Sequence, residues 1–316
     1  MSVREERVPG QHAKALRRRG RRSGAGALLG AAAAVSFAFG AVPARADDAA
    51  PQAPPQPPPC AMPIAVALAD RPGTGRTTST GGSPCVVAPS EIVFETGVRR
   101  QTMRNPDGSV TLSSGPLTFV RAGVAKRVEL GIAPPAYQSR AVSGVARVDA
   151  AHGQTDVVLA VKYLVLDAQN AQASLGASYA PPTGTGEFTA GAPTFSVSGN
   201  LGLALTPKLS LATSQVFGTA IGADVNGASR SFFVYAPSYT LAYALDGMTT
   251  VIGQAALVSR QGPVLPSGNR LLFALQRAVG SRLAVDLDYE TNVKPTLGAP
   301  QHAVGGGLVW ILKPAR

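Results

Sequence analysis

Strict alternation of apolar and polar side chains is the feature that most constrains the fold of this chain. Residues 155–165 read Thr-Asp-Val-Val-Leu-Ala-Val-Lys-Tyr-Leu-Val. Because strand side chains alternate between two faces, Val157, Leu159 and the residues in step with them share an apolar face, while Asp156 and Lys162 share the other. Residues 281–290 repeat the pattern with acidic side chains on the polar face. Such strands belong at a boundary between an apolar phase and water. The sequence pattern alone leaves open which side of the strand lies against the apolar phase.

An export signal precedes the mature chain. Residues 17–22 are rich in arginine, residues 25–42 form an apolar run of mainly Ala and Gly, and Ala44-Arg45-Ala46 places small residues where a signal peptidase cleaves. The shortness of the apolar run favours a signal peptide over a membrane-spanning helix. We expect residues 1–46 to be the signal peptide and Asp47 to begin the mature protein.

The basic balance of the chain comes mostly from this signal. The formal net charge is +11, but the first 46 residues hold 9 of the 29 basic residues and only 2 of the 18 acidic ones. The rest of the sequence shows no basic patch interleaved with aromatic residues, which is the footprint of nucleic-acid binding. We therefore expect no nucleic-acid partner.

Residues 47–90 are predicted to be a disordered periplasmic segment. Residues 51–59 are nearly all Pro, Gln and Ala, a composition that forms an extended spacer. Cys60 and Cys85 are the only cysteines, and in an exported protein they are disulfide candidates, with a stabilisation of about 3 kcal/mol. Two free cysteines are the alternative. Two cysteines without a nearby histidine do not suggest a metal site, and no cofactor is predicted.

From residue 91 onward the chain shows about twelve alternating segments and no helical period. Each has roughly the length that a tilted strand needs to cross a bilayer. The sequence therefore predicts an all-β domain over residues 91–316, a transmembrane antiparallel up-and-down β-barrel of about twelve strands. The predicted strands are 91–103, 113–123, 125–133, 155–165, 171–181, 193–205, 208–218, 230–245, 248–259, 269–279, 281–291 and 302–312.

The connections support an outer-membrane barrel, because short and long ones alternate along the chain. Outer-membrane barrels have short periplasmic turns and longer external loops. With an even number of strands, both ends of the barrel then lie in the periplasm. The short connections are Gly123-Val124, 167–170, Thr206-Pro207, Asp246-Gly247 and Gly280-Ser281, and the long ones are 134–154, 182–192, 219–229, 260–268 and 292–301.

A soluble barrel with its apolar face inward would show the same alternation, but two features favour the reverse. Small polar residues such as Ser174 and Asn200 share the charged face, which suits a wet lumen. Lys162 facing lipid near the midplane would cost roughly 2–4 kcal/mol. The apolar face also carries aromatic residues, several near strand ends as an interfacial girdle requires: Tyr163, Tyr179, Phe195, Phe217, Phe233, Tyr235, Tyr239, Tyr243, Phe273 and Tyr289.

The ordered motifs of residues 90–312 resemble the outer-membrane transporters associated with the meta-cleavage pathway of phenol degradation. The run 119–124 with 128–131 is similar to the Arg-x-Gly … Glu-Leu opening hairpin of that family. Residues 153–156 with Lys162-Tyr163 look like its Gly-x-x-Asp … Lys-Tyr strand, and 182–184 like its Pro-Thr-Gly loop. The resemblance implies outer-membrane passage of hydrophobic or aromatic solutes and names no particular substrate.

Two departures from this family pattern stand out. Gln254 occupies a place in the ninth strand where the family often has Glu. Family members often end on an aromatic residue that the barrel-assembly machinery reads, whereas here Trp310 is followed by Ile-Leu and then Lys-Pro-Ala-Arg. The expected partners are outer-membrane lipid, the barrel-assembly machinery and small hydrophobic solutes, and we expect a monomer.

Charged residues on the inward face are the candidate site. They could line a solute path and set its selectivity, or form a salt-bridged plug in a narrow barrel. An acidic stripe of Asp286, Asp288 and Glu290 allows the same two roles, with Arg270 and Arg282 as partners. The candidate lumen-lining residues are Arg121, Arg127, Glu129, Asp156, Lys162, Gln254, Asp286 and Asp288.

Two other function classes compete with a channel. An outer-membrane lipid hydrolase would need a nucleophile, a base and an orienting group, but the mature chain offers only His152 and His302, neither at a recognisable spacing from a serine. We therefore predict no enzyme activity. A structural or partner-binding barrel with a closed lumen remains the stronger alternative, because sequence does not distinguish an open pore from a closed one.

Overall fold

The computed structural model describes residues 83–105, 108–144, 149–223, 228–260, 262, 267–293 and 300–312. The predicted signal peptide and most of the predicted spacer, including Cys60, lie outside these residues. No helix in the described part of the chain combines the length and apolar character that crossing a membrane requires. The elements are β1 (Ile92–Asn105), β2 (Gly108–Ser114), β3 (Phe119–Ala125), β4 (Val128–Ala133), β5 (Tyr137–Gly144), β6 (Asp149–Gln154), β7 (Val158–Ala168), β8 (Ala171–Ala180), η1 (Gly186–Phe188), β9 (Thr194–Ala204), β10 (Leu209–Ala223), β11 (Ser229–Ala244), β12 (Thr249–Val258), β13 (Gly268–Ala278), β14 (Leu283–Asn292) and β15 (Pro300–Leu312).

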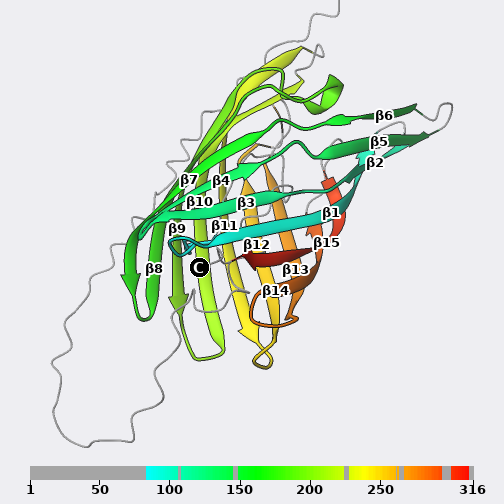
Figure 1. Cartoon of the computed structure of the whole chain (residues 1–316). Helices are drawn as coiled ribbons and strands as arrows, with labels where there is room; N and C mark the ends of the chain where they lie inside the picture. The colour runs from blue at the N-terminus through cyan, green and yellow to red at the C-terminus, as the bar shows by residue number, and fades with distance from the viewer. Residues whose placement is uncertain are drawn as a thin grey trace, which may run out of the picture. The chain divides into compact units, whose positions relative to one another are not determined.

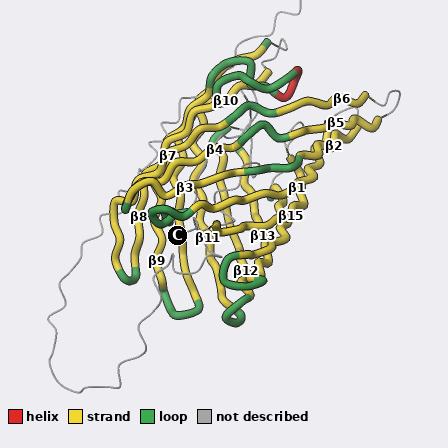
Figure 2. The backbone as a smooth tube through the Cα atoms, in the orientation of Figure 1, coloured by secondary structure: helices red, strands yellow, loops and turns green. Residues whose placement is uncertain are grey.

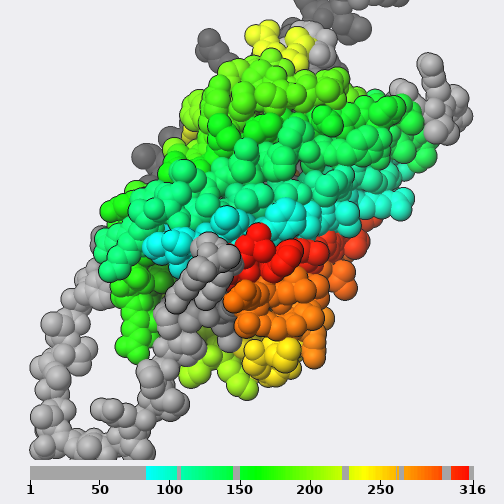
Figure 3. All heavy atoms as spheres, viewed as in Figure 1, coloured from blue at the N-terminus to red at the C-terminus, as the bar shows by residue number. Residues whose placement is uncertain are grey.

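The strands form one antiparallel sheet that closes on itself. From β7 to β15 each strand pairs with the next, β4 pairs with β3 and β7, and β3 pairs with β1. The last strand then returns to the first, with pairs running from Ile92–Leu312 to Met103–Pro300. Figure 3 shows β1 (cyan) lying directly against β15 (red). The predicted antiparallel barrel is confirmed.

The barrel has twelve strands, as predicted. The fifteen strand elements make twelve barrel strands because three of the barrel strands are each interrupted once. β2 and β3 form one barrel strand, β4 and β5 a second, and β6 and β7 a third. Pro116 lies in the first break and Pro134 and Pro135 in the second, where a residue without an N–H cannot donate to the ladder. Beyond the breaks β2, β5 and β6 run side by side and extend past the rest of the wall (Figure 1).

This extension corrects two predicted connections. Residues 134–154 are not a long loop, because β5 and β6 pair from Tyr137–Gln154 to Val142–Asp149. The side chains of β5 are all exposed or half-buried, so no apolar face marked the strand in the sequence. The tight turn predicted at Gly123-Val124 lies instead at Lys126 and Arg127, because β3 continues to Ala125.

Short and long connections lie at opposite ends of the barrel. The turns after β3, β7, β9, β11 and β13 gather at the lower end in Figure 2, and the β8–β9 connection with η1 (red) lies at the upper end. Ile92 pairs with Leu312, so the first and last described barrel residues meet at the end with the short turns. The predicted rhythm of connections is therefore seen only in part. The predicted long connection 134–154 contains β5 and β6, and the one predicted at 219–229 is shorter, because β10 continues to Ala223 and β11 begins at Ser229.

The outer surface of the barrel is apolar and the inner surface is polar. On β14 the outward Leu287 is 68% exposed, whereas its inward neighbour Asp288 is 7% exposed. On β7 the outward residues are Leu159, Val161 and Tyr163, and Lys162 is buried inside, as the sequence predicts. Nine of the ten aromatic residues assigned to the outer face are exposed. Tyr235 is half-buried, and its ring stacks on Phe217 with centroids 4.6 Å apart. A belt of apolar side chains around a closed barrel is the surface that a bilayer requires.

Candidate functional site

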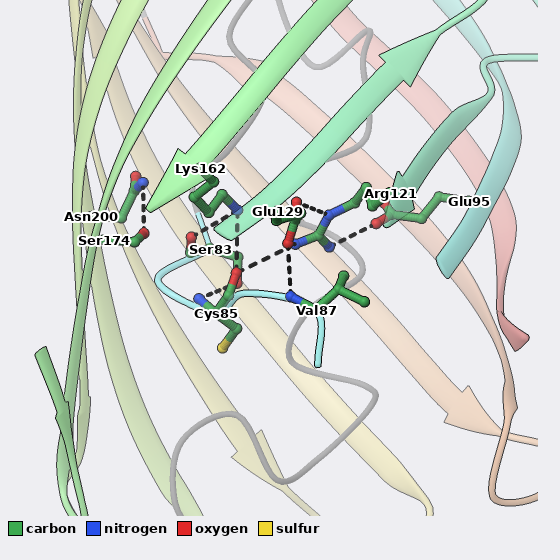
Figure 4. A network of polar contacts seen from close by, with 9 residues as sticks. All are labelled: Ser83, Cys85, Val87, Glu95, Arg121, Glu129, Lys162, Ser174 and Asn200. Carbon is green, nitrogen blue, oxygen red and sulfur yellow. Dashed lines mark hydrogen bonds and ion pairs between the residues drawn. The ribbon is translucent and has the colours of Figure 1, made fainter. Parts of the chain in front are cut away.

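A buried ionic centre joins three neighbouring strands of the inner wall near the end with the short turns. Arg121 on β3 is fully buried and binds Glu129 on β4 through two bonds, Nε to Oε1 at 2.6 Å and Nη2 to Oε2 at 2.8 Å. Its Nη1 reaches Oε1 of Glu95 on β1 at 3.0 Å. Glu129 stands opposite Lys162 of β7 in the strand register. We call Arg121, Glu129 and Lys162 the lumen clamp (Figure 4).

The lumen clamp binds the main chain of residues 83–90, which we call the inner segment. The Cys85 carbonyl accepts from Arg121 Nη2 and from Lys162 Nζ, each at 3.3 Å. Lys162 Nζ also donates to the Ser83 carbonyl at 3.2 Å, and the Val87 amide donates to Glu129 Oε2 at 2.8 Å. Figure 4 shows the inner segment beside the clamp, with all three side chains directed at it.

The inner segment therefore lies inside the barrel, so residues 83–90 do not belong to a disordered spacer. Ser83, Cys85 and Val87 are buried. Val87 packs with Val93 of β1 and Val309 of β15, both on the inner face. The sequence missed this placement because the segment has no alternation of its own and its partners are distant in the chain.

Two glycines of the wall make room for the inner segment. A Cβ at Gly123 would lie 2.1 Å from the Ala88 carbonyl oxygen, and a Cβ at Gly202 would lie 2.6 Å from Cγ of Pro84. Both distances are shorter than any real contact, so a side chain at either position would displace the segment. Ser90 adopts φ 64°, a left-handed conformation at the point where the chain turns from the lumen into β1.

The pairing of the two cysteines stays a prediction. There is no free cysteine in the part of the chain that the structure describes. Cys60, the predicted partner, lies outside that part. Within the same residues there is also no cluster of His, Cys, Asp and Glu suited to a metal ion.

A second group of buried charges, which we call the cross-strand cluster, bridges β15. Arg99 on β1 binds Asp288 through Nη1 and Glu290 through Nη2, each at 2.9 Å, and both carboxylates are on β14. Arg270 on β13 lies 3.5 Å from Glu290. β15 separates β1 from β14, and Gly305 stands between Arg99 and Asp288 in the register. A Cβ there would lie 2.4 Å from Asp288 Oδ2, so only glycine lets the pair meet across the strand.

Hydroxyl and amide groups cover the inner wall formed by β8, β9 and β10. Asn200 donates to Ser174 at 3.3 Å and accepts from Ser214 at 2.7 Å. Ser178 and Ser196 are hydrogen-bonded at 2.7 Å. This part of the wall is polar and carries no charge at these positions, in contrast to the ionic side at β1, β3, β4 and β14. The predicted wet face is thus hydrogen-bonded within the wall.

The structure brings together only some of the predicted site residues. Arg121, Glu129 and Lys162 form one site on neighbouring strands of the inner wall. Asp286 and Asp288 lie on the inner face of β14, away from that site. Gln254 faces inward from β12 and donates to Thr240 Oγ1 at 3.0 Å.

Two predicted lumen residues do not line the lumen. Arg127 lies exposed in the turn between β3 and β4, because β3 ends at Ala125 and β4 begins at Val128. Asp156 lies in the break between β6 and β7, where the strand parity that placed it inward does not apply. Arg282, a predicted partner of the acidic stripe, is exposed in the turn before β14.

Asp156 instead holds the connection between β8 and β9, an arrangement that we call the loop clamp. Its Oδ1 accepts from the Gly184 amide at 2.7 Å and from Thr189 Oγ1 at 2.8 Å. Its Oδ2 accepts from the Ala190 amide at 2.7 Å. One half-buried carboxylate thus orders the connection at the end opposite to the short turns.

The sequence reasoning missed Glu95 and Arg99 as site residues. Both lie on β1, two positions on either side of Gly97, and both are buried. The signal was present, since Glu95, Gly97, Arg99 and Gln101 share one parity of the predicted strand 91–103. Glu290 is a member of the predicted acidic stripe and Arg270 is its predicted partner, and the cross-strand cluster contains both.

Comparison with known proteins places the chain in a family. The family model described as "Putative MetA-pathway of phenol degradation" matches residues 69–262, more than half of the chain. The chain belongs to this family. None of the curated proteins matches the sequence significantly.

Solved structures similar to this family member are outer-membrane proteins. An outer-membrane channel from Pseudomonas putida F1 has a TM-score of 0.58 and 11% identity, covering 74% of this chain and 100% of that one. The toluene transporter TbuX of Ralstonia pickettii has a TM-score of 0.39 and 8% identity, covering 73% and 90%. The porin NanC has a TM-score of 0.46 and 10% identity, covering 68% and 98%. The likeness to the Pseudomonas channel is one of fold, an outer-membrane barrel.

Several residues of the motifs that predicted this family from the sequence lie in or beside the two clamps. Arg121, Gly123 and Glu129 from the opening hairpin, with Lys162 from the fourth barrel strand, form or accommodate the lumen clamp. Asp156 and Gly184 from the other two motifs meet in the loop clamp. The motifs therefore describe two places where the barrel wall binds its own main chain.

Proposed function

We propose that this protein is an outer-membrane channel through which small hydrophobic or aromatic solutes diffuse passively. The observation that carries the proposal is the division of the closed twelve-stranded barrel into an apolar outer surface and a polar inner one. A soluble barrel buries its apolar face, whereas this one presents it outward, where only lipid can cover it. The inner surface is then the place where a solute would pass.

The class of solute rests on the family and on the inner wall. The family is described by a pathway of phenol degradation. Ile252, Leu272 and Ala274 form a buried apolar cluster on the inner face of β12 and β13. The hydroxyl and amide row on β8 to β10 supplies hydrogen-bonding groups on another part of the wall. A solute with an aromatic ring and a hydroxyl group could contact both kinds of surface.

The orientation and assembly form part of the proposal. We place the short turns in the periplasm and the β8–β9 connection outside, as in other outer-membrane barrels. A signal peptide over residues 1–46 accounts for export, and the barrel-assembly machinery inserts a monomer into the lipid. We assign the protein no catalytic role, in keeping with the channels and porins that share its fold.

Single-channel recording in planar bilayers tests the channel directly. We expect the purified protein to give discrete conductance steps, and a deletion strain to take up a phenolic solute more slowly than the parent. Heat-modifiable migration on a denaturing gel confirms that the recorded protein is a folded barrel. A folded protein without conductance, together with unchanged uptake in the deletion strain, would refute the proposal.

One observation favours a second candidate, a structural barrel whose lumen is closed. The inner segment lies within the barrel and is bound by three buried side chains. If this arrangement is permanent, the wall charges serve stability and no solute passes. The same recordings separate the two candidates, because a permanently closed barrel conducts under no condition and in no variant.

A further inference from the structure

The inner segment is attached to the barrel wall differently from every strand. The strands pair through continuous ladders, whereas residues 83–88 are held by hydrogen bonds to the lumen clamp and by packing of Pro84 and Val87 against the wall. The first regular contact is an isolated bridge between Pro89 and Gly123, next to the turn at Ser90. β1 then pairs with β15 and β3 from Ile92 onward. The segment can therefore leave the wall without breaking a ladder of the barrel.

The ionic core of the lumen clamp would also survive the departure of the segment. Arg121 is paired with Glu129 and Glu95, and all three residues belong to the wall. The bond from Arg121 to the Cys85 carbonyl is additional to these ion pairs. Burying an arginine is costly only when it lacks a partner, so release of the segment leaves this charge compensated.

Lys162 makes a different contribution, because its ammonium group donates to two carbonyls of the segment. The Ser83 and Cys85 oxygens lie 3.2 and 3.3 Å from Nζ. An ammonium group is a compact charge on a flexible stem, so the same side chain can hold these carbonyls or turn toward water in the lumen. Of the three clamp residues, Lys162 is thus the one whose change loosens the segment and leaves the Arg121–Glu129 ion pair intact.

We propose that residues 83–88 are a gate of the channel, that Lys162 is its latch and that Ser90 is its hinge. The inference rests on the proposed channel function and adds its regulation. In the closed state the segment runs from Pro84, beside Gly202 of β9, to Val87, beside Val309 of β15, and so crosses the lumen between distant strands. In the open state it leaves the clamp, and the lumen near the short turns is free for a solute.

Recordings of the full-length protein with a latch variant test the gate. We expect Lys162→Met to increase the mean conductance or the open fraction severalfold, because Met keeps the stem and removes the donor. Lys208→Met, in the exposed turn between β9 and β10, is the matched control and should behave as the wild type. Heat-modifiable migration shows that each variant is a folded barrel.

A reversible lock provides a second measurement that does not depend on the latch. The Cβ of Pro84 lies 3.5 Å from the position of a Cβ at Gly202, a separation at which two cysteines can form a disulfide. We expect Pro84→Cys/Gly202→Cys, made in a Cys60→Ser/Cys85→Ser background, to conduct weakly when oxidised. Dithiothreitol should raise its conductance at least to that of the background protein, because a side chain at position 202 displaces the released segment. The reductant itself should have no effect on the background protein.

The possible results separate the gate from the channel. Conductance that rises in Lys162→Met and responds to reduction of the lock supports the gate. Equal conductance in the wild type, the latch variant and both states of the lock overturns the gate and leaves the channel standing. Folded proteins that all fail to conduct overturn the channel proposal, and the gate with it.

Discussion

The lumen clamp and the loop clamp lie at opposite ends of the barrel and hold non-strand segments with different chemical groups. Each uses side chains of the wall to bind main-chain groups of a segment that belongs to no strand. The lumen clamp combines an arginine, a glutamate and a lysine, all buried. The loop clamp uses the single carboxylate of Asp156, which is half-buried. The chemical groups that form each clamp therefore depend on whether water can reach them.

Inside the barrel a lone charge would be strongly disfavoured, so charges there come in pairs. Arg121 and Glu129 compensate each other and still have hydrogen-bonding capacity for the inner segment. At the β8–β9 connection water reaches the carboxylate, and two amides and a hydroxyl are sufficient partners for Asp156. Breaking the first arrangement leaves buried charge, and breaking the second leaves exposed loop atoms that water can solvate.

The largest effect is expected from Arg121→Met. It leaves Glu129 and Glu95 in the wall without their buried cation, and removing one member of a buried ion pair costs about 3–5 kcal/mol. Urea unfolding of the detergent-solubilised barrel measures the loss. Arg127→Met, in the exposed turn that follows β3, should change the free energy of unfolding by less than about 0.5 kcal/mol. Similar values for the two variants would mean that the lumen clamp is not a buried ionic centre.

A smaller loss is expected at the cross-strand cluster, which extends the comparison to charges that pair with one another across β15. Gly305→Ala places a methyl group 2.4 Å from Asp288 Oδ2 and pushes the carboxylate from Arg99. Overpacking of this kind costs about 1–3 kcal/mol, measured by the same unfolding experiment. Gly253→Ala on β12 is the control, because nothing lies within 4 Å of its Cβ. If Gly305→Ala is as stable as the control, the side chains do not meet across β15.

Replacement of Asp156 should act locally. Asp156→Ala removes all three acceptor bonds of the loop clamp, each worth about 1 kcal/mol, while the ladders of β7 and β8 remain. We expect faster hydrogen exchange at the Gly184 and Ala190 amides and little change in global unfolding. The control is Asp167→Ala, which removes a bond to Gln172 near a short turn. If Asp156→Ala lowers the free energy of unfolding as much as Arg121→Met does, the two clamps do not differ as described.

The smallest effect concerns a third carboxylate that binds amides, Asp246 in the turn between β11 and β12. The Met248 and Thr249 amides donate to its Oδ1, each at 2.7 Å, and hold its pKa below the ordinary value. A lowered pKa in the folded state means that the turn is stabilised above the pKa of the unfolded chain. This contribution is lost as pH falls through the folded pKa. Protection of the Met248 amide against exchange, measured relative to the intrinsic rate at each pH, should fall only in this acid range, and a fall beginning near neutral pH would contradict the assignment.

Most of the barrel wall could be predicted from the sequence, because period-2 alternation is a local signal. The strands from β7 to β15 agree closely with the predicted ranges, and Lys162 and Asp286 face inward as expected. β5 and β6 escaped prediction because neither face of β5 is buried, so no apolar periodicity was imposed on it.

The site was harder to predict than the wall, because its geometry depends on contacts between distant residues. Parity placed Asp156 in the lumen, but the strand is interrupted before Val158, and parity does not carry across a break. The inner segment has no local signal at all, since its partners are Arg121, Glu129 and Lys162. Gly123 and Gly202 make room for the segment, and the reason for these glycines is visible only in the folded protein.

The fluorescence of Trp310 tests most directly the claim that the outer face of the barrel meets lipid. Trp310 is the single tryptophan of the chain and is 50% exposed on β15, whereas the preceding Val309 is 2% exposed. In proteoliposomes we predict a blue-shifted emission that brominated lipids quench, most strongly when the bromine atoms lie near the headgroups, because Trp310 is close to the end of its strand. Emission typical of water, quenched by acrylamide and unaffected by brominated lipid, would contradict the account.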